Sequence, residues 1–256
     1  MLTDTHAHLY YPDILDSLPE ILRRAEEAGI GRVIVPAVNL ETSLKILDLS
    51  KEYEQIYCAL GLHPCDVSKS NPNEINEIEK LLSHKKVVAV GETGLDYYWD
   101  TSNIEQQKDL FRKQIRIASK LKLPVIVHTR DSTDDAITLM KEEYEQYPVR
   151  AHFHCFSGTL AQLSECLSIP DSHISFCGNI TYKKSLLDDV ISAAPIDRLL
   201  SETDSPFLPP MPYRGKKNEP SFMIKTLEKI SNVKGIPETE LMNVVSKNAE
   251  KFFALQ

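Results

Sequence analysis

The chain of 256 residues has no excess of positive charge and no long apolar run, and each absence excludes a class of protein. Lys and Arg total 29 against 37 Asp and Glu, a net charge of -8, which is unlike the basic footprint of a sequence-specific DNA-binding domain. An enzyme that acts on phosphodiesters stays open, because bound divalent cations supply positive charge locally. No apolar run approaches the roughly 20 residues that a membrane helix needs, so we expect no membrane association.

Paired cysteine motifs and a leader sequence are also missing. The five cysteines contain no Cys-x-x-Cys pair, which speaks against a disulfide framework and against a structural zinc knuckle. The first five residues show neither the basic nor the apolar region of a signal peptide. We therefore expect reduced thiols and a cytoplasmic protein, and we take a monomer as the default assembly.

The chain does contain a recurring alternation of short β-rich apolar runs and longer amphipathic stretches. The expected strands are 2–5, 32–36, 56–61, 87–91, 124–128, 151–154, 173–177 and 198–201. The expected helices are 15–28, 41–52, 73–83, 104–121, 131–146, 159–167, 184–194, 220–231 and 237–253. Eight alternations predict an α/β fold, a (β/α)8 TIM barrel with a single domain over residues 1–256. The alternative is a doubly wound sheet, which usually has a Gly-rich turn where this chain has His6-Ala7-His8.

Strong metal ligands stand at, or directly after, five of the expected strands. They are His6 and His8, Glu92, His128, His154, and the pair Glu202 and Asp204. In a parallel barrel the carboxyl ends of the strands meet on one face, where active sites lie, so we expect these side chains to converge. A single His or Glu at a strand end is more often a cap or a surface residue, and the prediction therefore depends on the whole set.

The ligand set predicts divalent metal chemistry. Imidazole suits Zn, Fe, Ni or Cu, and the added carboxylates allow Mn or Mg. Four histidines with two carboxylates exceed the needs of one tetrahedral metal and fit two metals, which clamp the oxygens of a phosphoryl displacement. Asp204 is expected to bind metal and to take the proton of the activated water. Glu202 is expected either to hold a further metal or to pair with a buried basic residue, and both readings stay open.

Two further histidines follow the same pattern at other strands. His63 ends the third expected strand, where we predict contact with substrate or indirect support of a ligand. His152 lies two residues before His154 and shares its face of the strand, so we expect it deeper in the barrel, supporting a ligand.

Four further residues are candidates for substrate binding. Arg214 belongs to a rare basic cluster after the eighth strand, where barrel enzymes often bind phosphate, although a solvated loop is the alternative. Arg130 follows His128 by two residues and has a similar case. Asn179 and Tyr182 follow the seventh strand and are weaker candidates.

These motifs resemble the TatD family of metal-dependent deoxyribonucleases, which belong to the amidohydrolase-like barrels. The matching segments, in chain order, are Asp4-Thr5-His6-Ala7-His8, Gly91-Glu92-Thr93-Gly94-Leu95-Asp96-Tyr97-Tyr98, Val127-His128-Thr129-Arg130, His154-Cys155-Phe156-Ser157-Gly158, Glu202-Thr203-Asp204-Ser205-Pro206 and Arg214-Gly215-Lys216-Lys217-Asn218-Glu219-Pro220. The resemblance covers essentially the whole chain. It departs only at Thr93, where a small aliphatic residue is frequent, and at Thr129, where Ser is common.

The resemblance implies a site with two ions of Mg, Mn or Zn. One ion would be held by His6, His8, Glu92 and Asp204, and the other by Glu92, His128 and His154, so that Glu92 bridges them. It further implies catalytic roles for Asp204 and Glu92, with hydrolysis of DNA phosphodiesters by a metal-activated hydroxide. The expected activity is that of a 3′–5′ exonuclease on the ends of single-stranded DNA.

Two other functions remain as alternatives. Some relatives are linked to removing D-amino acids from tRNA, which makes a D-aminoacyl-tRNA deacylase, or another ester or amide hydrolase on the same barrel, the second hypothesis. Many small-molecule amidohydrolases bridge their metals with a modified lysine on strand four, where this chain has Glu92. A metal-binding protein without enzymatic activity is the third, and a ligand-rich face with a candidate base argues against it.

Overall fold

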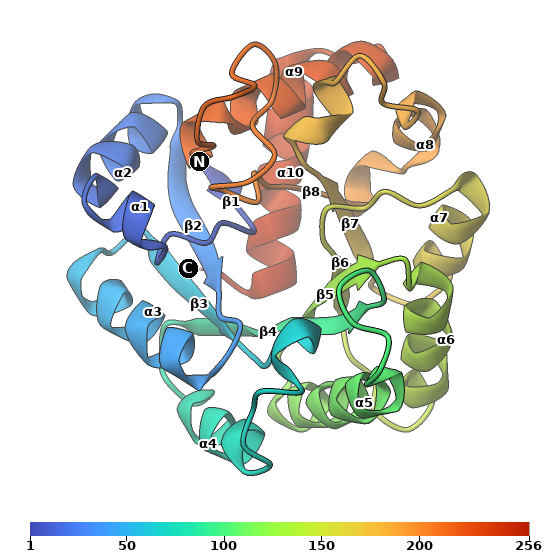
Figure 1. Ribbon diagram of the computed structural model, residues 1–256. Coiled ribbons are helices and arrows are strands. Elements are labelled where there is room, and N and C mark those ends of the chain that lie inside the picture. The colour runs from blue at the N-terminus through green and yellow to red at the C-terminus, as the bar shows by residue number, and fades with distance from the viewer. Residues whose placement is uncertain (256) are drawn as a thin grey trace. The chain divides into compact units, whose positions relative to one another are not determined.

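The computed structural model describes residues 1–255, and along this part of the chain eight strands alternate with helices (Figure 1). The strands are β1 (Leu2–Asp4), β2 (Ile30–Pro36), β3 (Ile56–Leu60), β4 (Val87–Asp96), β5 (Val125–Arg130), β6 (Ala151–Phe153), β7 (His173–Phe176) and β8 (Leu199–Ser201). Their order in the sheet is their order in the chain, as in a (β/α)8 barrel.

The helices lie between these strands and after the last one. They are α1 (Pro12–Leu15), α2 (Leu18–Glu27), α3 (Leu40–Glu52), α4 (Glu74–Leu81), α5 (Ile104–Leu121), α6 (Thr133–Tyr144), α7 (Leu160–Leu167), α8 (Asp188–Ala193), α9 (Met223–Lys234) and α10 (Glu238–Phe253). Among the described residues, no helix is both long enough and apolar enough to cross a membrane.

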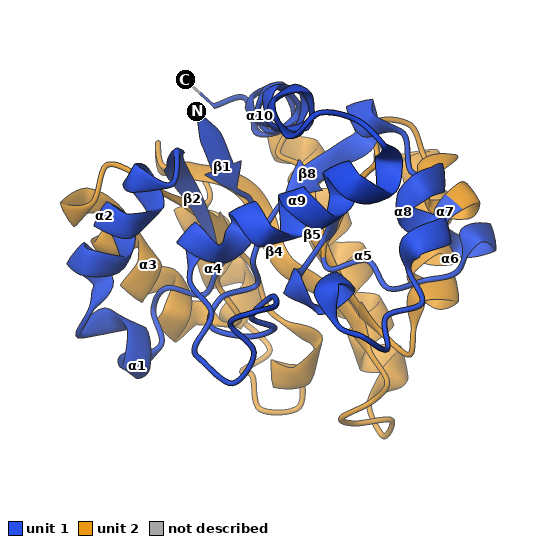
Figure 2. Cartoon of the chain, turned by 90° about the horizontal axis from the view of Figure 1, so that it is seen from above, with its two compact units in different colours: residues 1–35, 155–163, 174–256 blue, residues 36–154, 164–173 orange. Residues whose placement is uncertain are grey.

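The described chain forms two compact units, drawn in blue and orange in Figure 2. Unit 1 combines residues 1–35 and 155–163 with the segment that starts at residue 174 and includes α10. Unit 2 consists of residues 36–154 and 164–173. A single domain over residues 1–256 stays a prediction.

In unit 1, both ends of the chain contribute to one parallel arrangement of strands. β1 pairs with β2, and β7 pairs with β8. The segment after β1 joins β8, because the backbone N–H of Thr5 donates to the carbonyl of Ser201 at 2.9 Å. Ser246 of α10 donates its hydroxyl to the carbonyl of Met1 at 2.6 Å, so the last helix holds the first residue. The two halves of unit 1 therefore depend on each other for their backbone hydrogen bonds.

In unit 2, β4 is the central element and is buried at all ten positions. It pairs in parallel with β3 and β5, and β5 pairs with β6. The helix α5 packs against β4, and its buried Gln114 donates to the Leu62 carbonyl at 3.0 Å and accepts from the Leu62 N–H at 2.8 Å. A polar side chain on the apolar face of α5 thus satisfies the backbone where β3 ends.

The predicted ends of the fourth and fifth strands were wrong. β4 continues past residue 91 to Asp96, and β5 continues to Arg130, so Glu92 and His128 lie within strands. Gly94 pairs with His128 and has a φ of 133°, and a Cβ there would lie 2.1 Å from the His128 carbonyl oxygen. Glycine therefore extends the pairing of β4 with β5 here, although a glycine in a sequence normally indicates the end of a strand.

The helix that was predicted near residues 220–231 differs slightly from the prediction at both ends. Pro220–Phe222 form one 3-10 turn, and α9 begins at Met223. It ends three residues later than predicted, where Gly235 adopts the left-handed conformation, with a φ of 65°, that commonly terminates helices.

Candidate metal centre

Three predicted ligands of unit 1 lie close together after β1 and β8. His6 Nε2 lies 3.2 Å from His8 Nε2, and Asp204 Oδ1 lies 3.7 Å and 3.5 Å from these two nitrogens. Both imidazoles are buried, and the Asp204 side chain is 15 % exposed. Donor atoms about 2.0–2.1 Å from a tetrahedral zinc are about 3.3 Å apart. The spacing therefore fits one divalent ion held by these three residues.

The buried carboxylate of Asp4 holds this arrangement in place. Its Oδ1 accepts the backbone N–H of His6 at 3.2 Å and that of Thr203 at 3.0 Å, while Oδ2 accepts the Thr203 hydroxyl at 2.6 Å. Asp204 adds a backbone bond, since its N–H donates to the His6 carbonyl at 2.9 Å. Asp4 lies in the segment that resembles the TatD family, but sequence reasoning assigned it no role. It positions the two ligand segments relative to each other.

Tyr10 contacts the far side of the His8 ring. Its hydroxyl lies 3.2 Å from His8 Nδ1, which leaves Nε2 facing Asp204. A partner on the second ring nitrogen orients a metal-binding histidine and selects its tautomer. Sequence reasoning missed Tyr10, although its spacing of two residues from His8 repeats the spacing of the His-x-His pair.

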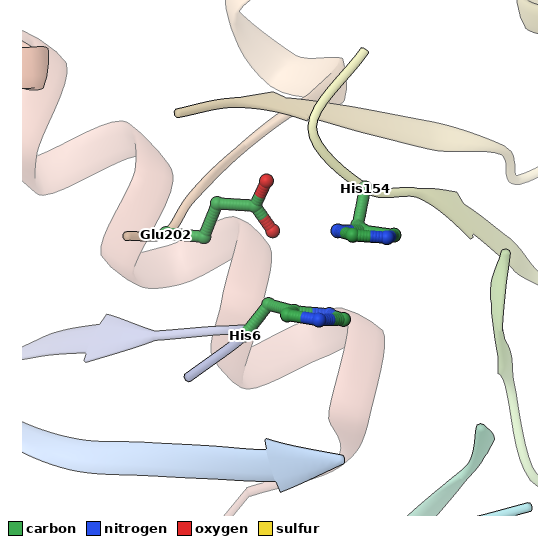
Figure 3. Close-up of side chains that lie close together, drawn as sticks. All are labelled: His6, His154 and Glu202. Carbon is green, nitrogen blue, oxygen red and sulfur yellow. The ribbon is translucent and has the colours of Figure 1, made fainter. Parts of the chain in front are cut away.

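Glu202 is fully buried and accepts hydrogen bonds from two cysteine residues of unit 1. Its Oε1 accepts the backbone N–H of Cys155 at 2.6 Å and the Cys177 thiol at 2.9 Å. Burial raises the pKa of the Cys177 thiol well above its ordinary value, so the thiol keeps its proton and donates it. Figure 3 shows the side chains of His6, His154 and Glu202 on the segments that carry them. A further metal on Glu202 stays a prediction.

The ligands of unit 2 surround one oxygen of Glu92. His128 Nδ1 and His154 Nε2 each lie 2.9 Å from Glu92 Oε1, and His63 Nε2 lies 3.5 Å from it. The Glu92 side chain is only 3 % exposed. His63 was predicted to contact substrate or to support a ligand, and the structure brings it directly to this group. Glu92, His63 and His128 offer ligand atoms close enough together for one ion.

Asp96 forms the second contact of the His128 ring, with Oδ2 3.0 Å from Nε2. Burial of the His128 ring alone lowers its pKa, but hydrogen bonds to Asp96 and Glu92 outweigh this effect and raise the pKa to about 9. For Asp96 the directions are reversed. Burial of the carboxyl group raises its pKa, but the hydrogen bond with His128 outweighs this effect and lowers the pKa to about 2. Two carboxylates therefore attract positive charge to this cluster, and a divalent cation supplies such charge.

Sequence reasoning missed Asp96 because the fourth strand was predicted to end at residue 91. The signal that would have found it is the two-residue period of a strand that continues from Glu92 through Gly94 to Asp96. The order of Glu92, His128 and Asp96 matches the carboxylate–histidine arrangement that orients metal ligands.

Three of the candidates for substrate binding lie on the segments that follow β7 and β8. The Arg214 guanidinium lies 4.9 Å from the centroid of the Tyr182 ring, whose hydroxyl donates to the Pro209 carbonyl at 3.0 Å. Asn179 lies half-buried in the 3-10 turn after β7. His152 is fully buried within β6, and its support of a ligand stays a prediction.

Both clusters suit a bound metal in their chemistry. Each combines imidazole nitrogens with carboxylate oxygens, the donor types that zinc and manganese accept. Each has three of the predicted ligands, His6, His8 and Asp204 in unit 1 and Glu92, His128 and His154 in unit 2. Three is the number of protein ligands that catalytic metal sites use while keeping a position open for water or substrate. The side chains present in this chain therefore fit divalent ions.

Comparison with known proteins gives the same family over the whole chain. The family model described as TatD related DNase matches residues 3–254. The chain is 39 % identical over 256 residues to the uncharacterized metal-dependent hydrolase YabD of Bacillus subtilis (strain 168), covering 100 % of both chains.

Two solved structures are similar along the whole chain. The crystal structure of YjjV, a TatD homologue from Escherichia coli K12, has a TM-score of 0.93 at 32 % identity, covering 100 % of this chain and 98 % of that one. A TatD family hydrolase from Entamoeba histolytica has a TM-score of 0.88 at 24 % identity over 100 % and 98 % of the two chains, which supports the fold. Together with the strand order, these similarities confirm the predicted (β/α)8 TIM barrel.

Proposed function

The chain belongs to the TatD-related DNase family of metal-dependent hydrolases, and we propose that it cleaves DNA phosphodiester bonds as a 3′–5′ exonuclease on single strands. The observation that carries this proposal is the pair of ligand clusters, His6–His8–Asp204 and Glu92–His128–His154, each fitted to a divalent cation. The polarity rests on the family resemblance alone.

Each cluster would hold one ion of Mg, Mn or Zn, and a bridging role for Glu92 stays a prediction. Bound divalent cations neutralise phosphate charge and lower the pKa of a coordinated water toward neutrality. His6, His8, His128 and His154 provide imidazole nitrogens as candidate ligands, and Asp96 and Tyr10 orient two of these rings.

Asp204 is the proposed general base of unit 1. Its carboxylate is 15 % exposed, so it keeps access to solvent while Oδ1 faces His6 and His8. In this position it accepts the proton of the attacking water as the new phosphorus–oxygen bond forms and the bond from phosphorus to the leaving ester oxygen breaks. Its backbone bond to His6 fixes the distance between base and ligands.

Positive side chains supply the contacts to the DNA backbone. Arg214 is exposed and lies over Tyr182, and Arg130 is exposed at the end of β5, two residues beyond His128. A planar guanidinium binds two phosphate oxygens at once, which positions a phosphodiester for in-line attack. Asn179 provides an amide near Tyr182 in sequence for a further polar contact with the strand.

A comparison of DNA with aminoacyl-tRNA tests this proposal. The manganese-loaded protein is incubated with single-stranded DNA labelled at its 5′ end, with the same strand labelled at its 3′ end, and with D-aminoacyl-tRNA. A 3′–5′ exonuclease produces a descending ladder from the 5′-labelled strand and releases the 3′ label immediately as a mononucleotide. Both products vanish in chelator and in the Glu92→Ala variant.

The same experiment distinguishes the alternative functions. Intact DNA together with rapid deacylation of the tRNA overturns the nuclease and supports an ester hydrolase. A ladder from the 3′-labelled strand reverses the polarity. Metal binding without either reaction supports the non-enzymatic alternative.

A further inference from the structure

Two large aromatic side chains are exposed directly after β4. Tyr98 is 55 % exposed and Trp99 is 68 % exposed, and their rings meet edge to face with centroids 5.0 Å apart. Trp99 is the single tryptophan of the chain. Exposed apolar rings do not gain the free energy of burial, so two adjacent rings on a solvent-exposed surface indicate a binding surface.

The buried carboxylate of Asp96 holds both aromatic residues. Its Oδ1 accepts the backbone N–H of Tyr98 at 3.0 Å and that of Trp99 at 3.1 Å. The other oxygen of the same carboxylate contacts His128 Nε2 at 3.0 Å. The Asp96 side chain therefore fixes both the turn that carries the two aromatic residues and the proposed metal ligand His128. Tyr98 and Trp99 follow Asp96 within three residues of the chain.

Arg130 adds a cation to the two rings. Its guanidinium carbon lies 3.7 Å from the centroid of the Tyr98 ring and 5.3 Å from that of the Trp99 ring. Arg130 pairs in register with Asp96 and follows His128 by two residues on β5. The exposed surface thus combines two π faces with a planar positive group, beside the ligands of unit 2.

This combination matches the chemistry of an unpaired nucleotide. Nucleobases stack on aromatic rings and on guanidinium planes without regard to sequence, and the adjacent phosphate attracts the cation. In a duplex the bases are paired and stacked on each other, so their faces are not available to the protein.

We propose that Tyr98, Trp99 and Arg130 form a stacking platform for a nucleobase of single-stranded nucleic acid, next to the phosphodiester that is hydrolysed. The platform rests on the proposed nuclease function and gives it a physical preference for single strands. Stacking supplies affinity that is independent of the base identity, as an exonuclease on any sequence requires.

The single tryptophan makes the platform directly observable. The full-length protein in chelator is titrated with oligothymidylate, with the same length of abasic oligonucleotide, and with a blunt duplex, while Trp99 fluorescence is recorded. We expect saturable quenching by oligothymidylate and little change with the other two probes, because only the first offers an unpaired base.

Variants measure the contribution of each group. Tyr98→Leu and Arg130→Gln keep the Trp99 signal, and Trp99→Leu is followed by the anisotropy of a labelled oligothymidylate. Each substitution is expected to weaken binding about 10-fold, corresponding to about 1.4 kcal/mol. All three side chains are exposed, so the fold tolerates the changes. Leu186→Ala, at a side chain that is 92 % exposed in unit 1, is the matched control and leaves binding unchanged.

The outcomes separate the platform from the nuclease function. Unchanged Trp99 fluorescence in a protein that degrades single-stranded DNA overturns the platform and leaves the function intact. Equal quenching by the abasic strand also overturns it, because the contact is then purely with phosphate. Base-dependent quenching in a protein that cleaves no DNA supports the platform and contradicts the nuclease.

Discussion

Asp96 and His128 are joined by a contact of 3.0 Å between Oδ2 and Nε2, although they are 32 residues apart in the chain. The opposite ring nitrogen of His128 lies 2.9 Å from Glu92. The imidazole is therefore held between two carboxylates, with one nitrogen directed to the ligand cluster. Because β4 extends beyond Glu92, Asp96 lies within contact distance of the His128 ring.

Replacing Asp96 by Asn tests this positioning role. The amide keeps an oxygen for the N–H groups of Tyr98 and Trp99 but removes the charge that orients His128. Loss of such a partner typically lowers metal affinity or activity about 10- to 100-fold. Competition with a chromogenic chelator measures the affinity. Asp48→Asn, at a side chain that is 76 % exposed, serves as the control and leaves it unchanged. Equal affinities in both variants contradict the role.

Metal binding is expected to stabilise the folded chain. A ligand at 100 times its dissociation constant adds about 2.7 kcal/mol to the free energy of unfolding. For a chain of this size that corresponds to a rise in Tm of roughly 5–10 °C. Scanning calorimetry with manganese and with chelator measures the rise, which shrinks in Glu92→Gln and persists in Glu54→Gln, where the residue is exposed. A Tm that manganese leaves unchanged disproves the metal assignment.

Gly94→Ala is expected to disrupt the pairing of β4 with β5. The new Cβ would lie 2.1 Å from the carbonyl oxygen of His128, and the φ of 133° is unfavourable for any side chain. We expect a loss of about 3 kcal/mol or more in urea unfolding. The control is Gly235→Ala, where φ is 65° and no atom lies within 4 Å of the added Cβ, with an expected loss of about 1 kcal/mol. Similar losses in both variants would show that the close approach is relieved elsewhere.

The ion pair between Arg24 and Glu219 predicts a pH-dependent contribution to stability. Arg24 donates two hydrogen bonds to the carboxylate, at 2.8 Å and 2.6 Å. Burial raises the pKa of Glu219, but the bonds from Arg24 and Ser221 outweigh it and hold the pKa below the ordinary 4.5. The contribution is therefore fully present above pH 4.5 and is lost as the pH falls through the lower folded-state pKa.

The corresponding measurement is the Tm of the natural chain and of Glu219→Gln, each recorded over a series of pH values. We expect the variant to be less stable by about 1 kcal/mol near pH 7, with the difference closing in acid. Asp13→Asn is the matched control, because the Asp13–Lys217 pair is largely exposed and contributes little. A difference between the natural chain and Glu219→Gln that widens in acid would reverse the sign of the argument.

The close approach of the candidate ligands within each unit was predictable because each follows an apolar β-rich run and parallel strands direct their carboxyl ends to the same side. The spacing of His6 and His8 gave their shared direction, and their Nε2 atoms indeed face each other at 3.2 Å. The strand order was predictable for the same reason, since eight alternating segments leave few topologies.

The contacts of unit 2 that the sequence did not predict depend on where its strands actually end. The predicted fourth strand ended at Gly91, and only the close approach of Gly94 to His128 reveals why glycine is required inside β4. With β4 cut short, Asp96 fell into a predicted loop and its contact with His128 was invisible. Arg130 was predicted to bind substrate, but its contact with Tyr98 depends on the pairing of Asp96 with Arg130.

The composition of unit 1 from both ends of the chain has a consequence for its synthesis. Thr5 finds its partner Ser201 only 196 residues later. At about 5–20 residues per second, the ribosome needs roughly 10 to 40 seconds to cover that interval. The ligands of unit 2 are all present once residue 154 has been made, whereas His6 and His8 wait for Asp204. A chain released early therefore carries one set of ligands without the other.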